Sequence, residues 1–182
     1  MSRIEVQIND VAAIAGLSAL IARGSDISPL MAMLGGKLTD STMDRFATST
    51  APDGSPWAPN AHTAIRQALD RNKRSLSKRS GALTKTGKTI AAGKKPLIGE
   101  TGALGTTIDY QLLGRDTVEI GSGTKYAATH QFGAKQGAFG RSKRGGPIPW
   151  GDIPARPFLG ISAQDERTIT SVINEYLAAP WE

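Results

Sequence analysis

The chain has 182 residues, a formal net charge of +6 and no cysteine. This length fits one domain, or one domain with appendages, and the lack of cysteine excludes disulfides and cysteine-based zinc or thiol chemistry. The isoelectric point near 9.8 favours an acidic partner, either nucleic acid or an acidic protein face, although it also fits plain solubility. The start of the chain lacks an apolar signal core, and no run approaches about 20 apolar residues, so we expect a soluble protein made in the cytoplasm.

The first fifty residues indicate a strand and two helices. Residues 3–8 alternate apolar and polar side chains, which is typical of a half-buried strand. A stripe of aliphatic residues predicts a helix over 11–23 that ends at Gly24. Ser28-Pro29 indicates the cap and first residue of a second helix over about 29–49.

An irregular connection follows over residues 51–59. Its Pro-Asp-Gly run predicts a tight turn, because proline fixes φ, aspartate bonds nearby backbone and glycine permits a positive φ. We expect Trp57 to pack over the preceding helix and to belong to the core.

Residues 66–95 form a basic segment. A helix is predicted over 63–74, and beyond it the pattern decays into Ser, Gly and Lys, so we interpret 75–96 as an extended or mobile arm or an insertion. A solvated charged face is the alternative. If the segment contacts a partner or DNA, the side chains expected to do so are Lys78, Arg79, Lys85 and Lys88.

The middle of the chain predicts a β-hairpin and a long basic loop. Residues 106–113 and 117–121 alternate apolar and polar side chains around a Gly-Arg-Asp turn. Residues 126–131 indicate a short helix or turn that ends at Gly133. The loop 134–152 is rich in glycine, and its candidate partner or DNA contacts are Lys135, Arg141, Lys143 and Arg144.

The last forty residues carry an apolar segment and the clearest helix of the sequence. Apolar residues at helical spacing predict a helix over about 163–178, capped by Ser162, with acids in its first turn. We expect Phe158 and Leu159 to bury against this helix near Ile169 and Ile173. Arg156 is interpreted as a contact with a neighbouring subunit or partner, with bonds inside its own subunit as the alternative. The predicted core residues are Trp57, Tyr126, Phe132, Phe158, Leu159, Ile169, Val172 and Ile173.

The sequence offers no site for catalysis, cofactor or metal. The two histidines, His62 and His130, lack neighbours at metal-ligand spacing, and we interpret His130 as a structural residue beside Tyr126. The glycine-rich run at 121–124 lacks the spacing of a phosphate-binding loop. We therefore expect a protein that is not an enzyme and that needs no cofactor.

Several segments, taken in order, resemble one family. They are Phe46 with Pro52–Pro59, then Leu97–Leu104, Tyr126–Gly133, and Ile153–Gly160 with the terminal helix. In this combination the chain, over about residues 1–178, is similar to the phage virion morphogenesis family, the tail-completion and head–tail joining proteins of Mu-like and P2-like tailed phages. The basic segment fits this set of motifs least well.

The resemblance implies an α+β fold: one domain over 1–182 with a small antiparallel sheet, N-terminal helices, a C-terminal helix and long basic loops. It implies a structural virion protein of the neck, assembled in the bacterial cytoplasm. Such subunits form a ring at the head-proximal end of the tail, with a hexamer favoured over a dodecamer. The implied partners are tail tube and sheath proteins, head-side connector or stopper proteins, and packaged DNA in the lumen, with no membrane.

The alternative function is a basic protein that grips DNA non-specifically. Charge supports it, but few aromatic residues lie among the basic ones for stacking on bases, and no DNA-binding motif is present. In either case we expect the basic segments 66–95 and 134–146 to be mobile in the free subunit, to become ordered on assembly, and to include at least one that faces a central channel.

Overall fold

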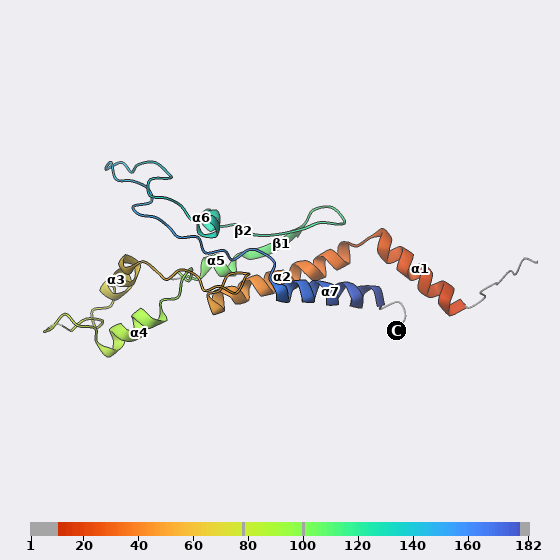
Figure 1. The fold of residues 1–182 in the computed structure, drawn as a ribbon, viewed down its shortest axis with the longest axis horizontal. Helices are drawn as coiled ribbons and strands as arrows, with labels where there is room; N and C mark the ends of the chain where they lie inside the picture. The colour runs from red at the N-terminus through yellow and green to blue at the C-terminus, as the bar shows by residue number, and fades with distance from the viewer. Residues whose placement is uncertain (1–10, 78, 100, 179–182) are drawn as a thin grey trace, which may run out of the picture.

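The computed structural model describes residues 11–77, 79–99 and 101–178. The strand predicted for residues 3–8 lies outside this part of the chain. Figure 1 shows an elongated molecule, in which a body built along one long helix carries extensions at both ends. The described residues form seven helices and a two-stranded antiparallel sheet, which confirms the predicted α+β class.

Helix α2 (Ser28–Thr48) is the axis of the body. The helix begins one residue before the prediction, so Ser28 is its first residue and not its cap. The carboxylate of Asp26 accepts hydrogen bonds from the backbone N–H and the hydroxyl of Ser28, and Pro29 fits the first turn because it has no N–H to leave unpaired.

Strands β1 (Ile108–Leu112) and β2 (Val118–Ser122) form the predicted hairpin on one side of α2. Its inner face carries Ile108, Tyr110 and Leu112, with Tyr110 opposite Ile120. The ring of Tyr110 lies so close to Gly35 of α2 that an added Cβ would stand 2.4 Å from it. Glycine at this position therefore permits the close approach of helix and hairpin.

Helix α7 (Ala163–Ala178) packs beside α2 with the bounds predicted for it. The two helices run antiparallel, because the end of α2 meets the start of α7 through Arg45 and Asp165. Ser162 caps α7: its hydroxyl accepts from the backbone N–H of Asp165, whose carboxylate accepts from the N–H and hydroxyl of Ser162. This reciprocal arrangement satisfies N–H groups that the first turn leaves unpaired.

The core divides into two clusters. One gathers Phe46, Trp57, Leu104, Ile108 and Phe158 at the end of α2, with the rings of Phe46 and Trp57 5.3 Å apart. The other joins Leu30 and Leu34 of α2 to Val172, with Ile169 and Ile173 partly buried against them. The expectation that Phe158 packs near Ile169 and Ile173 is wrong. Phe158 is fully buried, but in the first cluster, because the chain reaches α7 by crossing the far end of α2.

Residues 153–162, which we call the strap, connect the arm described below to α7. The strap has no regular secondary structure, yet its backbone is bonded by the side chains of the body. Trp57 Nε1 donates to the carbonyl of Pro157 at 2.7 Å, and Arg45 donates to the carbonyls of Phe158 and Gly160. The side-chain oxygen of Gln131 accepts from the N–H groups of Phe158 and Leu159. Polar backbone in this crossing is therefore satisfied although it lies in the core.

Helix α1 (Val11–Ser25) projects from the end of the body where α2 begins, away from the cluster of Phe46 and Trp57. It confirms the predicted helix and extends two residues further. Its apolar stripe is exposed, since Val11, Ile14, Leu17 and Ile21 keep between 51% and 81% of their surface accessible.

Helices α3 (His62–Asp70) and α4 (Lys85–Gly93) pack on each other in a second extension, the basic limb, residues 62–99. Residues 75–96 are not extended throughout, because the nine residues of α4 lie within them. Whether this segment is mobile or an insertion stays a prediction. Thr84 caps α4 by accepting from the N–H of Gly87, and Gly87 in turn lies against the backbone of Ser75, where a Cβ would not fit. Two short helices, α5 (Ala103–Thr106) and α6 (Ala127–Phe132), complete the body, and Gly133 ends α6 at a positive φ as predicted.

The surface of the chain is large for its mass. The whole chain exposes 13013 Å², whereas a compact monomer of 19.2 kDa exposes about 8,400 Å². The extensions contribute to this large accessible surface, because they project from the body and do not fold over it.

Candidate interaction surfaces

Residues 134–152 form an arm that projects from the body beside α6 (Figure 1). The predicted basic loop is a hydrogen-bonded hairpin. Ala134 pairs with Ile153 at its root and Arg141 with Pro147 near its tip. Between them the N–H of Phe139 donates to the carbonyl of Ile148 at 2.7 Å, and the N–H of Ile148 donates to the carbonyl of Gly140. Backbone bonds thus define the path of the arm, while its side chains point outward.

The arm presents exposed aromatic and basic side chains together. Trp150 is 80% and Phe139 57% exposed. Arg141, Lys143 and Arg144 are exposed as well. The basic residues of the arm were predicted as contacts from the sequence, but the two aromatic residues were not. Two large apolar side chains in a glycine-rich loop are a signal that could have been used. Aromatic and arginine side chains are the residue types that dominate protein interfaces.

Lys135 differs from the other basic residues of the arm. Its ammonium bonds the carboxylate of Asp152 at 2.7 Å across the root. This bond raises the pKa of Lys135 and holds the pKa of Asp152 below its ordinary value, with a further hydrogen bond from the N–H of Gln136. Both groups are exposed, so the pair fixes the geometry of the root more than it stabilises the fold.

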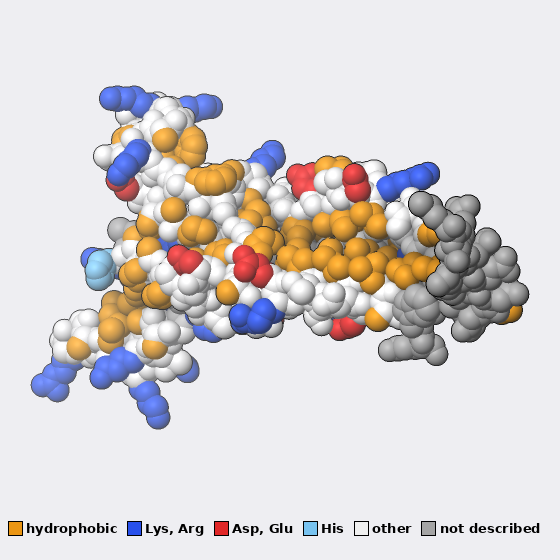
Figure 2. Space-filling model, turned by 45° about the vertical axis from the view of Figure 1, so that its right-hand side comes forward, with side chains coloured by type: hydrophobic (Ala, Val, Ile, Leu, Met, Phe, Trp, Pro, Cys, Tyr) orange, Lys and Arg blue, Asp and Glu red, His pale blue; other side chains and the backbone are white. Residues whose placement is uncertain are grey.

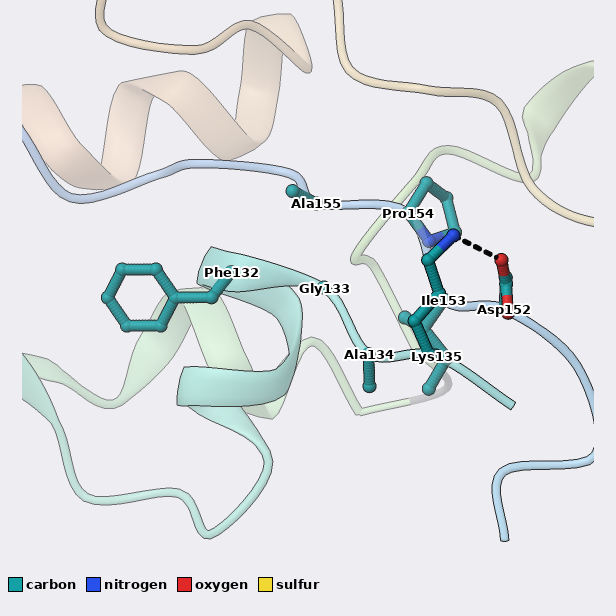
Figure 3. Close-up of a pocket in the computed structure, with 8 residues that line it drawn as sticks. All are labelled: Phe132, Gly133, Ala134, Lys135, Asp152, Ile153, Pro154 and Ala155. Atoms are coloured by element: carbon teal, nitrogen blue, oxygen red, sulfur yellow. Dashed lines mark hydrogen bonds and ion pairs between the residues drawn. The ribbon is translucent and has the colours of Figure 1, made fainter. Parts of the chain in front are cut away.

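Figure 3 shows an open hollow at this root, with a volume of about 490 Å³. The hollow lies where the chain leaves α6 and where it returns into the strap. The ring of Phe132 points away from the bonded pair of Lys135 and Asp152. Since the charged groups that line the hollow are bonded to each other, the arrangement suits an apolar contact better than a charged ligand.

Arg156 lies inside the fold. It is 6% exposed, and its guanidinium donates to the carbonyls of Ala58 at 2.7 Å and Pro59 at 2.8 Å. The interpretation of Arg156 as a contact with a neighbouring subunit is wrong, and the alternative of bonds within its own subunit is confirmed. Pro157 disfavours a helical backbone at Arg156, which agrees with the irregular conformation of the strap.

Two of the predicted core residues are on the surface. Phe132 is 79% and Tyr126 45% exposed, because α6 turns only its Ala127 side toward the core. Trp57, Phe158 and Val172 are buried, and Leu159, Ile169 and Ile173 are partly buried. An exposed Phe132 at the root adds a third aromatic side chain to the surface of the arm.

The basic limb carries the other predicted contacts. Arg79, Lys85 and Lys88 are exposed on it, and Lys78 lies outside the described residues. The limb is attached to the body by Asn60, which donates to the carbonyl of Lys94, and by Lys95, which donates to the carbonyl of Ala47. Its exposed cations therefore stand on a folded support.

His130 lies beside Tyr126, as predicted, in an edge-to-face contact with 5.9 Å between the ring centroids. Burial lowers the pKa of His130, and the positive charge of Arg156 lowers it further, so the ring is neutral at pH 7. Within residues 11–77, 79–99 and 101–178, the structure brings together no group of three His, Asp or Glu side chains that could hold a metal ion. In the same residues, no helix has both the length and the apolar character required to cross a membrane.

Comparison with known proteins shows the family to which the chain belongs. The model of the phage virion morphogenesis family matches residues 8–99 and 83–178. The chain is 28% identical over 148 residues to tail completion protein S of Escherichia phage P2, which covers 81% of this chain and 82% of that relative. It is 44% identical over 57 residues, 31% of this chain and 35% of the relative, to Mu-like prophage FluMu G protein 2 of Haemophilus influenzae. No solved structure matches the chain significantly. Because the family model spans most of its length, the chain belongs to the phage virion morphogenesis family.

Proposed function

We propose that this chain is a structural virion protein that completes the phage tail. In this proposal, subunits form a ring at the head-proximal end of the tail, end the growth of the tail tube and join the tail to the DNA-filled head. The observation that carries the proposal is the match along 148 residues to a protein named tail completion protein. A ring of six is favoured over twelve, because it follows the symmetry of the tail.

The shape of the subunit supports a role in assembly. A monomer with separate extensions and exposed Trp150, Phe139 and Phe132 has apolar surface that neighbours can cover. Tail tube and sheath proteins on one side, and head-side connector or stopper proteins on the other, are the neighbours expected in the neck. The exposed cations of the basic limb suit the side of the ring that faces packaged DNA.

Deletion of the gene from an inducible prophage tests the proposal. We expect lysates of the deletion strain to contain DNA-filled heads and separate tails, because the joining step is lost while both parts still assemble. A plasmid copy of the gene should restore joined particles, and immunogold labelling should place the protein at the head-proximal tail end. Joined particles at wild-type yield without the gene would contradict the proposal.

A salt series separates tail completion from the alternative of non-specific DNA binding. We expect the purified protein to lose duplex DNA steeply as salt rises toward 200 mM, as any basic protein does. Tight binding of duplex by monomers at 150–200 mM salt, together with absence from purified virions, would favour the DNA-binding function.

A further inference from the structure

The arm of one subunit and the surface between the hairpin and α7 of another are complementary. Figure 2 shows a continuous apolar band on the half of the molecule where the hairpin and α7 flank α2. The partly exposed apolar residues of these elements include Met31 of α2, Leu112, Val118 and Ile120 of the hairpin, and Ile173 and Leu177 of α7. We call this surface the apolar band. These side chains stay partly exposed because the hairpin, α2 and α7 cover one another only in part.

The charges at the band are opposite to those on the arm. The hairpin carries Asp109, Asp116 and Glu119 against one arginine, Arg115, and Glu166 is exposed in the first turn of α7. On the arm, Arg141, Lys143 and Arg144 are exposed, and its one acid, Asp152, is bonded to Lys135. In Figure 2, Lys and Arg gather on the extensions, whereas Asp and Glu lie mainly along the margins of the band, together with a few Lys and Arg side chains.

We infer that the arm docks on the apolar band of the next subunit, with Trp150 and Phe139 in the band and the basic tip against its acidic margins. This inference rests on the proposed function, in which subunits form a ring. The arm and the hairpin turn lie toward opposite ends of the molecule, so an arm does not reach the band of its own subunit (Figure 1). Different surfaces of the same chain then meet head to tail, and such a contact closes into a ring when its rotation permits.

The residue types on both sides fit a stable interface. A tryptophan and a phenylalanine beside arginines are typical of the side chains that contribute most to association, and an apolar centre with a charged rim is the usual anatomy of an interface. The opposite charges favour the correct register and resist the docking of a second basic arm on another arm. The inference leaves the basic limb free for the DNA side of the ring.

Cross-linking tests the contact directly, because the chain has no cysteine of its own. The double variant Ala138→Cys with Thr117→Cys places one thiol on the arm and one on the hairpin, both at exposed positions. A short bis-maleimide should then produce a ladder of multimers, both in the purified protein and in assembled tails. Mixed single variants should stop at dimers, because each subunit then offers only one thiol.

The matched control is Ser80→Cys with Thr117→Cys, which moves the first thiol from the arm to the exposed limb. It should give no ladder. A ladder from the control at the same yield, or no ladder from the arm variant in tails that contain the protein, would overturn the inference. Neither result would bear on the deletion phenotype, so failure of this contact can be told apart from failure of the proposed function.

Charge reversal provides a second test with a rescue. Arg141→Glu with Arg144→Glu should weaken self-association, and so should Asp116→Arg with Glu166→Arg, whereas the four changes together should restore it. Trp150→Ala should weaken association by at least about thirtyfold, the effect of losing a dominant interface residue. Lys85→Glu with Lys88→Glu on the limb is the control and should leave self-association unchanged. Reversal of the arm without effect on association in tails would contradict the inference.

Discussion

The strap and the arm are continuous in the chain, yet they are stabilised in opposite ways. From Pro157 to Gly160 the backbone of the strap is bonded by side chains that come from α2, α6 and the loop before α3, and Arg156 of the strap donates to the backbone of that loop. In the arm, the backbone bonds join one half of the hairpin to the other, and Trp150 and Phe139 are exposed. The strap therefore belongs to the fold of the subunit, whereas the arm exposes aromatic side chains that are available to contact another molecule.

The largest expected effect is at the centre of the strap. Phe158→Ala should destabilise the fold by about 3–5 kcal/mol, because the fully buried ring packs on Phe46 and its loss leaves a cavity. Chemical denaturation of the purified protein measures this. Phe132→Ala is the matched control, since the same side chain is 79% exposed at the root of the arm and should cost less than about 0.5 kcal/mol. Equal losses in both variants would remove the distinction between strap and arm.

A smaller effect is expected where the strap enters α7. Burial raises the pKa of Asp165, but hydrogen bonds from Ser41 and Ser162 and the charge of Arg45 lower it more, so the net pKa is below the ordinary value. Because the pKa of Asp165 is lower in the folded state, the unfolded chain binds a proton at this carboxylate more readily. The ionised carboxylate therefore stabilises the fold above about pH 4, and this stabilisation is lost as the pH falls through the folded pKa.

Asp165→Asn should therefore cost about 2–3 kcal/mol at pH 7, the range for losing hydrogen bonds to a charged group. Unfolding curves of both proteins should converge as the pH is lowered below about 4. Ser41→Ala serves as control, because it removes one of these bonds and keeps the ion pair. A gap between wild type and Asp165→Asn that is independent of pH would show that the carboxylate charge contributes nothing.

Arg156→Ala should cost about 1–3 kcal/mol, because it leaves the carbonyls of Ala58 and Pro59 without their donor. If Arg156 were instead a contact with a partner, as interpreted from the sequence, the variant would leave the isolated fold intact and would reduce joining. Thermal unfolding of the isolated subunit measures the change. Arg156→Lys should recover part of it, and a variant as stable as wild type that still fails in joining would restore the earlier interpretation.

The smallest effect on the fold is expected at Trp150 of the arm. Trp150→Ala should change the free energy of unfolding by less than about 0.5 kcal/mol, because the ring is 80% exposed. The same variant should lose self-association, so stability and assembly separate at this residue. A loss of stability similar to that of Phe158→Ala would mean that the arm is part of the core.

Elements with long periodic patterns could be predicted from sequence, and those that depend on distant partners could not. Helix α7 has five apolar residues at helical spacing and a Ser162 cap, and its bounds were predicted correctly. Helix α4 was missed because two glycines and four lysines or threonines obscure its pattern; the cap at Thr84 was a local signal for it.

Burial was harder to predict than secondary structure. Phe132 and Phe158 are both phenylalanines beside glycine or proline, and one is exposed while the other is fully buried. The difference arises from the path of the strap across α2, which no local pattern contains. Arg156 illustrates the same limit, because its partners lie almost one hundred residues away. The mobility of the basic segments before assembly stays a prediction.

The position of the strap also has a mechanical consequence. Tension that enters through the tip of the arm loads the hairpin bonds one after another, from Arg141 and Pro147 toward the root, as in the opening of a zipper. In the strap, the same tension would load the hydrogen bonds to Trp57, Arg45 and Gln131 at the same time. Force on the arm would therefore lengthen the arm before it reached the core, so that the arm could extend while the body kept its shape.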